Sequence, residues 1–310
     1  MRTLSEDEVR QHLGPLTLVG ELESAFRDRF TQVTISARMH IALDTGIFLI
    51  MPCYDRTGRA LGMKLVTVQN QPARPEDRIQ ATVMLFDLET GKPRLVMAAN
   101  YLTDLRTAAA SAVATKFLAG KDVRTLGIFG TGRQARAHLT VLPMVRDFDR
   151  VLICGKNDAS SKEFCEQVAD DGSLPVEPAD PDRCAAESDV LCTCTTSQSP
   201  LFDGKLLRPG THLNLVGTFQ PQAREVDSLT IRRALLVVDT YDGVLVEAGD
   251  ILIPMGEGVI KRDHAQADLH GLVSGSLAGR SADITVFKSV GCAFEDLIAA
   301  ELVAKGANIQ

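Results

Sequence analysis

A glycine-rich segment behind an apolar run carries the clearest chemical signal in the sequence. The stretch from Gly130 to Ala135 reads Gly-Thr-Gly-Arg-Gln-Ala, which matches G-x-G-x-x-G/A between an expected strand and an expected helix. The first glycine allows a tight turn, the second lets backbone approach a pyrophosphate, and Ala135 keeps the helix close to the strand. Free N–H groups at the positive helix end then face the phosphates. The motif predicts a dinucleotide site, and the alternative is a glycine-rich turn that binds nothing.

The next expected strand carries information about which dinucleotide would bind. It ends in Cys154-Gly155-Lys156-Asn157, without the Asp or Glu that usually holds the ribose 2′-hydroxyl of NAD. Lys156 is placed to pair with a 2′-phosphate. The sequence therefore favours NADP(H) over NAD(H), the alternative being that Lys156 is a solvated loop residue.

Three cationic side chains in apolar surroundings are candidates for substrate chemistry. Lys64 lies in Leu-Gly-Met-Lys-Leu-Val-Thr-Val, and a buried lysine is costly unless it is paired or functional. Desolvation lowers the pKa of a lysine, which suits proton transfer or an imine substrate. Arg38 and Arg106 are candidates for bidentate binding of an amino-acid carboxylate. For each of the three, an exposed or merely structural role is the alternative.

Histidines and cysteines give weaker signals. His40 carries little information, and His138, inside the helix after the glycines, is expected to be structural. The cysteines fit no zinc pattern, so we expect no metal site and interpret them as buried thiols of a reducing compartment. A catalytic cysteine is the alternative. The seven are Cys53, Cys154, Cys165, Cys184, Cys192, Cys194 and Cys292.

Length and charge limit the class of protein. With 310 residues the chain exceeds one ordinary hydrophobic core, which predicts two domains. A net charge of −7 argues against general nucleic-acid binding. The N-terminus lacks the apolar core of a signal peptide, and no apolar run reaches the ~20 residues that span a bilayer. We therefore expect a cytoplasmic protein without membrane or nucleic-acid partners.

The expected secondary structure differs between the two parts of the chain: the first is rich in strands, and in the second strands alternate with helices. A helix over 5–29, capped by Ser5, precedes strands expected at 33–43, 46–54, 61–69, 81–88 and 94–99. A helix capped by Thr103 follows at 102–118 and ends before Gly120. Strands at 125–129, 151–154, 189–193, 212–216, 234–238 and 284–287 then alternate with helices, and a helix at 294–305 closes the chain. This rhythm indicates βαβ units and a parallel sheet.

The fold class expected from this order of strands and helices is α/β. A Rossmann dinucleotide-binding domain is assigned to residues 119–291. An α+β substrate-binding and dimerisation domain is assigned to residues 1–118 and 292–310.

Several motifs, in order along the chain, resemble the ornithine cyclodeaminase/mu-crystallin family. They are Leu-Thr-Asp-Leu-Arg-Thr-Ala-Ala-Ala-Ser at 102–111, Gly-Thr-Gly-Arg-Gln-Ala-Arg-Ala-His-Leu at 130–139, Val-Gly-Thr-Phe-Gln-Pro at 216–221, Arg-Glu-Val-Asp at 224–227, and Val-Phe-Lys-Ser-Val-Gly with Glu-Asp at 286–296. The resemblance covers nearly the whole chain. It implies a homodimer built through the N-terminal domain and an active site between the domains.

The resemblance also implies roles for individual residues. Arg38, Lys64 and Arg106 would hold the substrate carboxylate and polarise the reacting centre, and Val290 would face the substrate. The implied cofactor contacts are Thr82, Thr131, Gly132, Arg133, Gln134, Thr195, Gly217, Arg224 and Ser289.

Two departures from the family pattern bear on the substrate. An Asp that acts as the acid/base in the cyclodeaminase is replaced here by Phe219, and a Glu that meets the substrate amine is replaced by Leu49. A second cationic amine would enter an apolar pocket unpaired, which is costly. The hypothesis is therefore hydride transfer between a nicotinamide and the Cα of a small imino or amino acid, as in a ketimine reductase. The alternatives are true ornithine cyclodeamination and a non-enzymatic protein that binds NADP(H) and a ligand.

Overall fold

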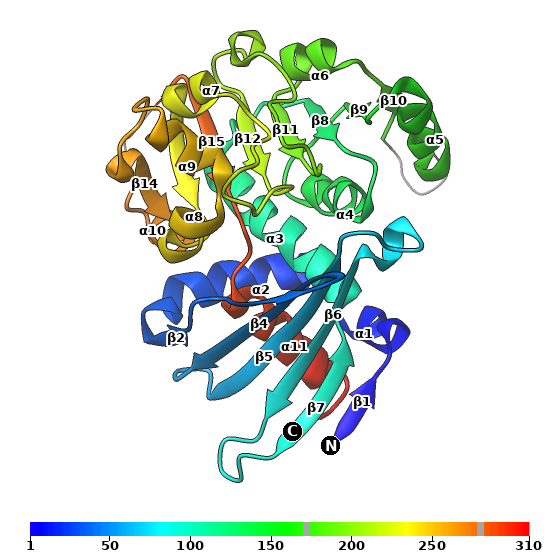
Figure 1. Cartoon of the computed structure of the whole chain (residues 1–310), viewed down its shortest axis with the longest axis vertical. Helices are drawn as coiled ribbons and strands as arrows, with labels where there is room; N and C mark the ends of the chain where they lie inside the picture. The colour runs from blue at the N-terminus through cyan, green and yellow to red at the C-terminus, as the bar shows by residue number, and fades with distance from the viewer. Residues whose placement is uncertain (170–173, 278–281, 310) are drawn as a thin grey trace. The chain divides into compact units, whose positions relative to one another are not determined.

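The computed structural model describes residues 1–169, 174–277 and 282–309, and the chain forms two compact units (Figure 1). Unit 1 comprises Met1–Ala110 and Gly291–Gln310, and unit 2 comprises Ser111–Val290. Helix α3 (Asn100–Leu118) contains the first boundary, which the sequence analysis expected after residue 118. The separate roles assigned to the two parts of the chain stay predictions.

Unit 1 is built on a mostly antiparallel sheet. Within the described residues its strand order is β1 (Arg2–Leu4), β7 (Pro93–Ala98), β6 (Ile79–Phe86), β5 (Ala60–Gln69), β4 (Gly46–Asp55) and β2 (Val33–Ile35). Strand β3 (Met39–Leu43) also pairs with β4, so the single strand expected over 33–43 is two strands that flank Arg38.

The helices of unit 1 cover one face of this sheet. Helix α11 (Ala293–Gly306) packs on β4 and β5, and α2 (Pro15–Asp28) and α1 (Glu6–His12) pack on α11. Figure 1 shows α11 lying against the strands of the N-terminal part of the chain. Residues of β5 alternate between buried and half-buried, as expected when one sheet face meets a helix.

The first helical segment differs from the sequence expectation. A single helix over 5–29 is wrong: α1 ends at His12, and Pro15 begins α2. Pro15 has no backbone N–H and disfavours helical backbone in the residue before it, so the helix breaks there. Ser5 does cap α1, because its hydroxyl accepts from the N–H of Glu8 and the Glu8 carboxylate accepts in return. Thr103 lies inside α3 and does not cap it.

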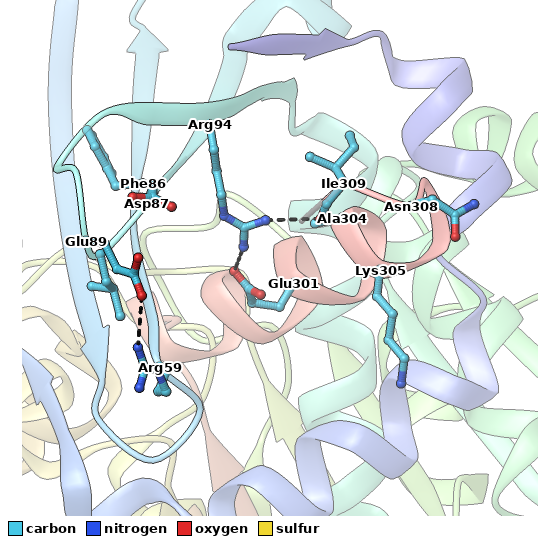
Figure 2. Close-up of a pocket in the computed structure, with 11 residues that line it drawn as sticks. Arg59, Phe86, Asp87, Glu89, Arg94, Glu301, Ala304, Lys305, Asn308 and Ile309 are labelled. Atoms are coloured by element: carbon cyan, nitrogen blue, oxygen red, sulfur yellow. Dashed lines mark hydrogen bonds and ion pairs between the residues drawn. The ribbon is translucent and has the colours of Figure 1, made fainter.

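A charged hollow lies where the β6–β7 turn meets α11 (Figure 2). Its volume is about 530 Å³. Arg94 closes part of it by donating to Glu301 at 2.5 Å and to the carbonyl of Ile309 at 3.2 Å. None of the site residues expected from the sequence lines this hollow, and its arginine is already paired with a carboxylate.

Unit 2 contains a parallel sheet. Among the described residues the strand order is β10 (Val176–Pro178), β9 (Arg150–Cys154), β8 (Thr125–Phe129), β11 (Val190–Thr193), β12 (His212–Leu215), β15 (Ile284–Lys288), β13 (Ala234–Val238) and β14 (Ala265–Asp268). The first five follow the 3-2-1-4-5 part of the Rossmann order, and β15, the last strand of the sheet in the chain, takes the sixth place beside β12. This parallel, doubly wound sheet confirms the expected fold class. The direction of winding reverses between β8 and β11, and dinucleotides bind at such a reversal.

Helices connect these strands. They are α4 (Arg133–Val141), α5 (Asp158–Val168), α6 (Pro181–Glu187), α7 (Ser228–Arg233), α8 (Tyr241–Glu247), α9 (Gly249–Gly256) and α10 (Leu269–Val273). Short 3-10 helices occur at Phe30–Gln32, Pro75–Arg78, Leu142–Met144, Gly204–Leu206 and Arg262–His264. No helix in the described ranges combines the length and apolar character that crossing a bilayer requires.

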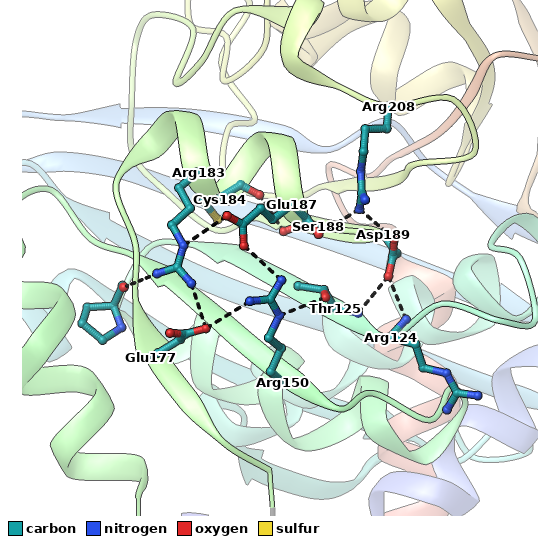
Figure 3. A network of polar contacts seen from close by, with 11 residues as sticks. Arg124, Thr125, Arg150, Glu177, Arg183, Cys184, Glu187, Ser188, Asp189 and Arg208 are labelled. Atoms are coloured by element: carbon teal, nitrogen blue, oxygen red, sulfur yellow. Dashed lines mark hydrogen bonds and ion pairs between the residues drawn. The ribbon is translucent and has the colours of Figure 1, made fainter.

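An exposed ion-pair network holds the amino-terminal edge of the parallel sheet (Figure 3). Arg150, at the start of β9, pairs with Glu177 and Glu187, and Arg183 pairs with the same two carboxylates. Asp189, just before β11, accepts from the backbone N–H of Thr125 at the start of β8. These contacts join the starts of strands at the amino-terminal edge of the sheet. The glycine-rich loop lies at the opposite, carboxyl-terminal edge.

Candidate functional site

Lys64 is a buried lysine paired with one carboxylate. Its side chain leaves β5 on the face covered by α11 and is 2% exposed. The Lys64 ammonium donates to Oδ1 of Asp296 at 2.7 Å. The exposed-strand alternative for Lys64 is therefore wrong, because the buried face of β5 carries this residue.

Arg106 shares the same carboxylate. Its Nε lies 3.0 Å from Oδ1 of Asp296, and its Nη1 donates to Glu295 at 2.6 Å. Arg38 donates to the carbonyl of Gly291 at 2.9 Å. A Cβ on Gly291 would come within 2.5 Å of the Arg106 guanidinium, so the turn before α11 lies directly against that cation. All three cations expected from the sequence therefore gather around the start of α11.

The charges of this cluster suit an anionic ligand and a proton donor. Two of the three cations, Lys64 and Arg106, pair with the carboxylates of Glu295 and Asp296, and Arg38 adds a further positive charge, so the formal charge of the cluster is +1. Burial lowers the pKa of Lys64 to about 8, and the Arg106 cation adds to this while Asp296 opposes it. Burial alone would lower the pKa of Arg106, but Asp296 and Glu295 raise it above its ordinary value. Lys64 is thus protonated near neutral pH yet able to release its proton.

The two carboxylates received no role from the sequence. Glu295 and Asp296 lie in the first turn of α11, a helix whose other buried residues are all apolar. Two adjacent acids opening an apolar helix are the signal that could have identified them. A helix N-terminus stabilises carboxylates, and buried carboxylates need cationic partners.

The glycine-rich loop of unit 2 has the geometry of a phosphate-binding turn. Gly130 follows β8 with φ +112, and a Cβ there would lie 2.5 Å from the carbonyl oxygen of Cys194. Gly132 is the N-cap of α4, and no side chain of the described residues caps that end. Ala135 is fully buried, as close packing of helix and strand requires. The glycine-rich turn thus leads into the N-terminus of α4, and a helix N-terminus is where a Rossmann fold binds the pyrophosphate.

Other predicted cofactor residues lie at the same edge of the sheet. Thr195 follows β11, Gly217 follows β12 and Ser289 follows β15, each just beyond the carboxyl end of its strand. The Ser289 hydroxyl donates to Asp239 at 2.8 Å. Ligands of doubly wound sheets bind at this edge.

Two further cationic candidates differ in their surroundings. Lys156 is exposed in the loop after β9. Arg224 is half-buried and donates to Glu257 and to the hydroxyl of Ser228, each at 3.0 Å. Arg224 is therefore already occupied by protein partners, whereas the Lys156 ammonium lies in solvent.

Residues expected to face the substrate or cofactor occur in both units. In unit 1, Leu49 is buried on β4 and Thr82 is half-buried on β6. In unit 2, Phe219 is half-buried, and Val290 is buried with its N–H donating to Asp239 at 2.8 Å. Their assignment to substrate and cofactor stays a prediction.

His138 has the bonding of a structural histidine. Its Nδ1 lies 2.8 Å from the carbonyl of Gln134, so that nitrogen carries the proton, and Nε2 accepts from the hydroxyl of Ser111 at 2.9 Å. Burial lowers the pKa of His138 to about 4. The seven cysteines are free thiols, of which Cys194 is half-buried and the others are buried. Burial raises the pKa of the Cys194 thiol, which disfavours a nucleophilic role.

A doubly wound sheet with a glycine-rich loop at its carboxyl edge defines a dinucleotide-binding protein of Rossmann type. The lysine and arginine cluster of unit 1 adds a buried group of cations around Asp296. The model of the ornithine cyclodeaminase/mu-crystallin family matches residues 2–308, and the chain belongs to this family.

Several relatives in this family carry names that state an enzymatic activity. The chain is 36% identical over 276 residues to a Bacillus cereus protein named Delta(1)-pyrroline-2-carboxylate reductase, covering 87% of this chain and 85% of the relative. It is 34% identical to the ketimine reductase mu-crystallin of Rattus norvegicus, covering 97% and 95%. The structure of Thermococcus litoralis Delta(1)-pyrroline-2-carboxylate reductase in complex with NADH and L-proline superposes with a TM-score of 0.94. That protein is 36% identical, with 99% of this chain and 98% of the other covered.

Proposed function

We propose that this protein is a nicotinamide-dinucleotide-dependent reductase of a small cyclic imino acid, with Δ1-pyrroline-2-carboxylate as its candidate substrate. The observation that carries the proposal is the buried cluster of Lys64, Arg106 and Asp296, in which a proton donor adjoins carboxylate-binding cations. The names of the Bacillus cereus and Thermococcus litoralis relatives support the choice of substrate.

The reaction requires one hydride, one proton and a fixed carboxylate. When bound, a reduced dinucleotide would supply the hydride for the imine carbon. Arg38 and Arg106 hold the substrate carboxylate, and Lys64 donates a proton to the imine nitrogen. The C=N double bond thereby becomes a C–N single bond, with one new C–H and one new N–H bond. Oδ2 of Asp296 is buried and accepts no hydrogen bond from the described residues. This oxygen is suited to accept from the protonated nitrogen of the product.

The residue types at positions 49 and 219 bear on the choice of substrate. Leu49 is 4% exposed and Phe219 is half-buried, and neither can neutralise a second ammonium group. Burial of an unpaired charge costs several kcal/mol, so ornithine is disfavoured against a ring without that charge. The residue types at these two positions thus support imine reduction over cyclodeamination.

The preferred dinucleotide is proposed to be NADP(H). Asn157, after β9, caps α5 by accepting from the N–H of Ser160, so its side chain faces its own helix. Lys156 is left as the exposed side chain that can reach a 2′-phosphate. The related Thermococcus litoralis complex contains NADH. The preference proposed for this chain therefore rests on Lys156.

A homodimer through unit 1 is proposed from the exposure of β3. All five residues of this edge strand are exposed, among them Met39, Ile41 and Leu43. An apolar edge strand in water tends to pair with a second chain. Ile41→Lys should convert a dimer into monomers in sedimentation velocity, whereas Thr34→Lys on β2 should not. A wild-type monomer, or a dimer that is unaffected by Ile41→Lys, would contradict this assembly.

The test of function is product analysis. Purified protein with NADPH or NADH and Δ1-pyrroline-2-carboxylate should form proline, with one dinucleotide oxidised for each proline. Ornithine with NAD(P)⁺ should yield no proline. Proline formed from ornithine without net dinucleotide turnover would overturn the reductase assignment in favour of cyclodeamination. Dinucleotide binding without any turnover would instead favour a binding protein.

A further inference from the structure

Glu225 is a fully buried carboxylate at the carboxyl edge of the parallel sheet. Its Oε1 accepts from the backbone N–H of Thr195 at 2.9 Å and from the hydroxyl of that residue at 2.7 Å. Its Oε2 accepts from the hydroxyl of Thr193 at 2.8 Å and from the N–H of Gly217 at 2.9 Å. One side chain therefore joins the loops that follow β11 and β12.

Gly217 lies against this carboxylate. A Cβ at Gly217 would come within 2.3 Å of Glu225 Oε1 and within 2.3 Å of the Thr195 carbonyl oxygen. The two loops and the carboxylate are consequently packed without space for a side chain. Any change in the position of Glu225 must move Thr195, Gly217 or both.

A second layer holds Glu225 in place. Asp250, at the start of α9, accepts from the backbone N–H of Glu225 at 2.7 Å and lies 2.9 Å from the ammonium of Lys288. Lys288, the last residue of β15, also donates to the carbonyl of Thr218 at 2.7 Å. All three charged side chains are fully buried, and one ammonium faces two carboxylates. Burial, followed by the nearby Asp250 charge, raises the pKa of Glu225.

The place of this network in the fold indicates its ligand. Strands β11, β12 and β15 lie side by side on the other side of the reversal from β8, β9 and β10, and they form the second half of the Rossmann sheet. The glycine-rich loop follows the first strand of the other half. The two halves of the fold each bind one mononucleotide, and the pyrophosphate lies at the glycine-rich loop between them. The loops joined by Glu225 thus belong to the half opposite the adenosine.

A role in stability alone does not explain why Glu225 and its charged partners are buried. The amino-terminal edge of the same sheet is joined by exposed ion pairs around Arg150 and Arg183 (Figure 3). Buried ion pairs often stabilise no more than apolar residues of similar volume. A buried carboxylate with four donors instead fixes the orientation of two backbone N–H groups with high precision.

We propose that Glu225 is a positioning residue for the nicotinamide half of the dinucleotide, and that Asp250 and Lys288 hold it in place. It acts through Thr195 and Gly217 and does not itself touch the ligand. The inference rests on the proposed function only in taking a nicotinamide dinucleotide as the ligand.

The test separates the two halves of the dinucleotide. Glu225→Gln keeps the volume but sets an amide NH₂ against an N–H donor of Thr195 or Gly217. We expect the Kd of NADPH and NADH, measured by fluorescence titration, to rise about tenfold. The Kd of ADP, which carries the adenosine and the pyrophosphate but no nicotinamide riboside, should change less than about twofold. Glu187→Gln, which removes a carboxylate from the amino-terminal edge, should alter neither constant.

Thr193→Val provides a second variant if Glu225→Gln does not fold. It removes one hydroxyl donor to Glu225 at nearly constant volume and should raise the Kd of NADPH about threefold, again without affecting ADP. An equal rise in the Kd of NADPH and of ADP, or an unchanged Kd of NADPH in these variants, would overturn the inference. Absence of dinucleotide binding by the wild-type chain would overturn it as well. Normal binding without imine reduction would overturn only the proposed function.

Discussion

At the scale of the residue, one carboxylate oxygen of Asp296 contacts both Lys64 and Arg106 in unit 1. Oδ1 of Asp296 lies 2.7 Å from the Lys64 ammonium and 3.0 Å from Nε of Arg106. Without this carboxylate two buried cations would face each other, and their repulsion would favour the neutral lysine. Asp296 therefore keeps Lys64 protonated near neutral pH, while burial and Arg106 keep its pKa at about 8.

The first prediction concerns the pH dependence of Asp296→Asn. In the proposed reaction the ammonium of Lys64 is the proton donor, so kcat for imine reduction should fall as pH rises through about 8. Asp296 raises the pKa of Lys64, and its removal should shift this falling limb to lower pH. The measurement is kcat across the alkaline range at saturating substrate. Glu301→Gln, on the same helix, should leave the limb in place, and an unmoved limb in Asp296→Asn would contradict the role of Lys64.

A second prediction at this scale concerns Lys156. Replacing the exposed lysine by Ala removes the cation proposed to pair with the 2′-phosphate. The KM for NADPH should rise about tenfold while the KM for NADH stays within about twofold. Lys162→Ala, an exposed lysine on α5, serves as the matched control. Equal effects on both dinucleotides would rule out a 2′-phosphate contact.

At the scale of the element, local patterns in the sequence determine most boundaries. The strands expected at 125–129 and 234–238 match β8 and β13 residue for residue. Their continuous apolar runs are bounded by polar or glycine residues. The single helix expected over 5–29 is wrong because Pro15 interrupts an otherwise helical pattern of residues.

The candidate site was only partly predictable, for a physical reason. Lys64, Arg38 and Arg106 stand out because a cation in an apolar segment is costly. Their partners come from the distant helix α11, so pairing depends on tertiary contacts that no periodicity encodes. The same holds for Glu225, whose four donors come from residues up to 32 positions away. Glu225 gives no signal of this pairing in its own segment, whereas Glu295 and Asp296 stand out only as two acids that open an apolar helix.

A third prediction concerns helix α4 and its buried histidine. The pKa of His138 is lowered to about 4, and that of His212 on β12 to about 3, so both are neutral when folded. Between pH 6.5 and 4 the unfolded chain binds more protons, so stability is lost as pH falls. Each histidine should contribute a slope of about 1.4 kcal/mol per pH unit in this range.

The measurement is urea unfolding at several pH values in that range. His138→Asn should reduce the slope of the free energy of unfolding against pH. His40→Asn, at an exposed position of unit 1, should leave it unchanged. A slope that His138→Asn does not alter would show that the folded protein tolerates the charged imidazole.

At the scale of the whole molecule, the chain separates two kinds of chemistry. Unit 1 carries the buried cations, and unit 2 carries the glycine-rich loop and the Glu225 network. Cations and a helix N-terminus are suited to anionic groups, although the net charge of the chain is −7. The proposed binding therefore depends on local charge placement and not on overall charge.

The central claim is that Lys64 supplies the proton for imine reduction, and Lys64→Met tests it most directly. Methionine preserves the buried volume and leaves Asp296 paired with Arg106. With Δ1-pyrroline-2-carboxylate and NADPH, kcat should fall by about a hundredfold or more, while the Kd for NADPH is unchanged. Lys305→Ala, an exposed lysine on α11, should retain the wild-type kcat. A folded Lys64→Met protein with wild-type kcat would contradict the account.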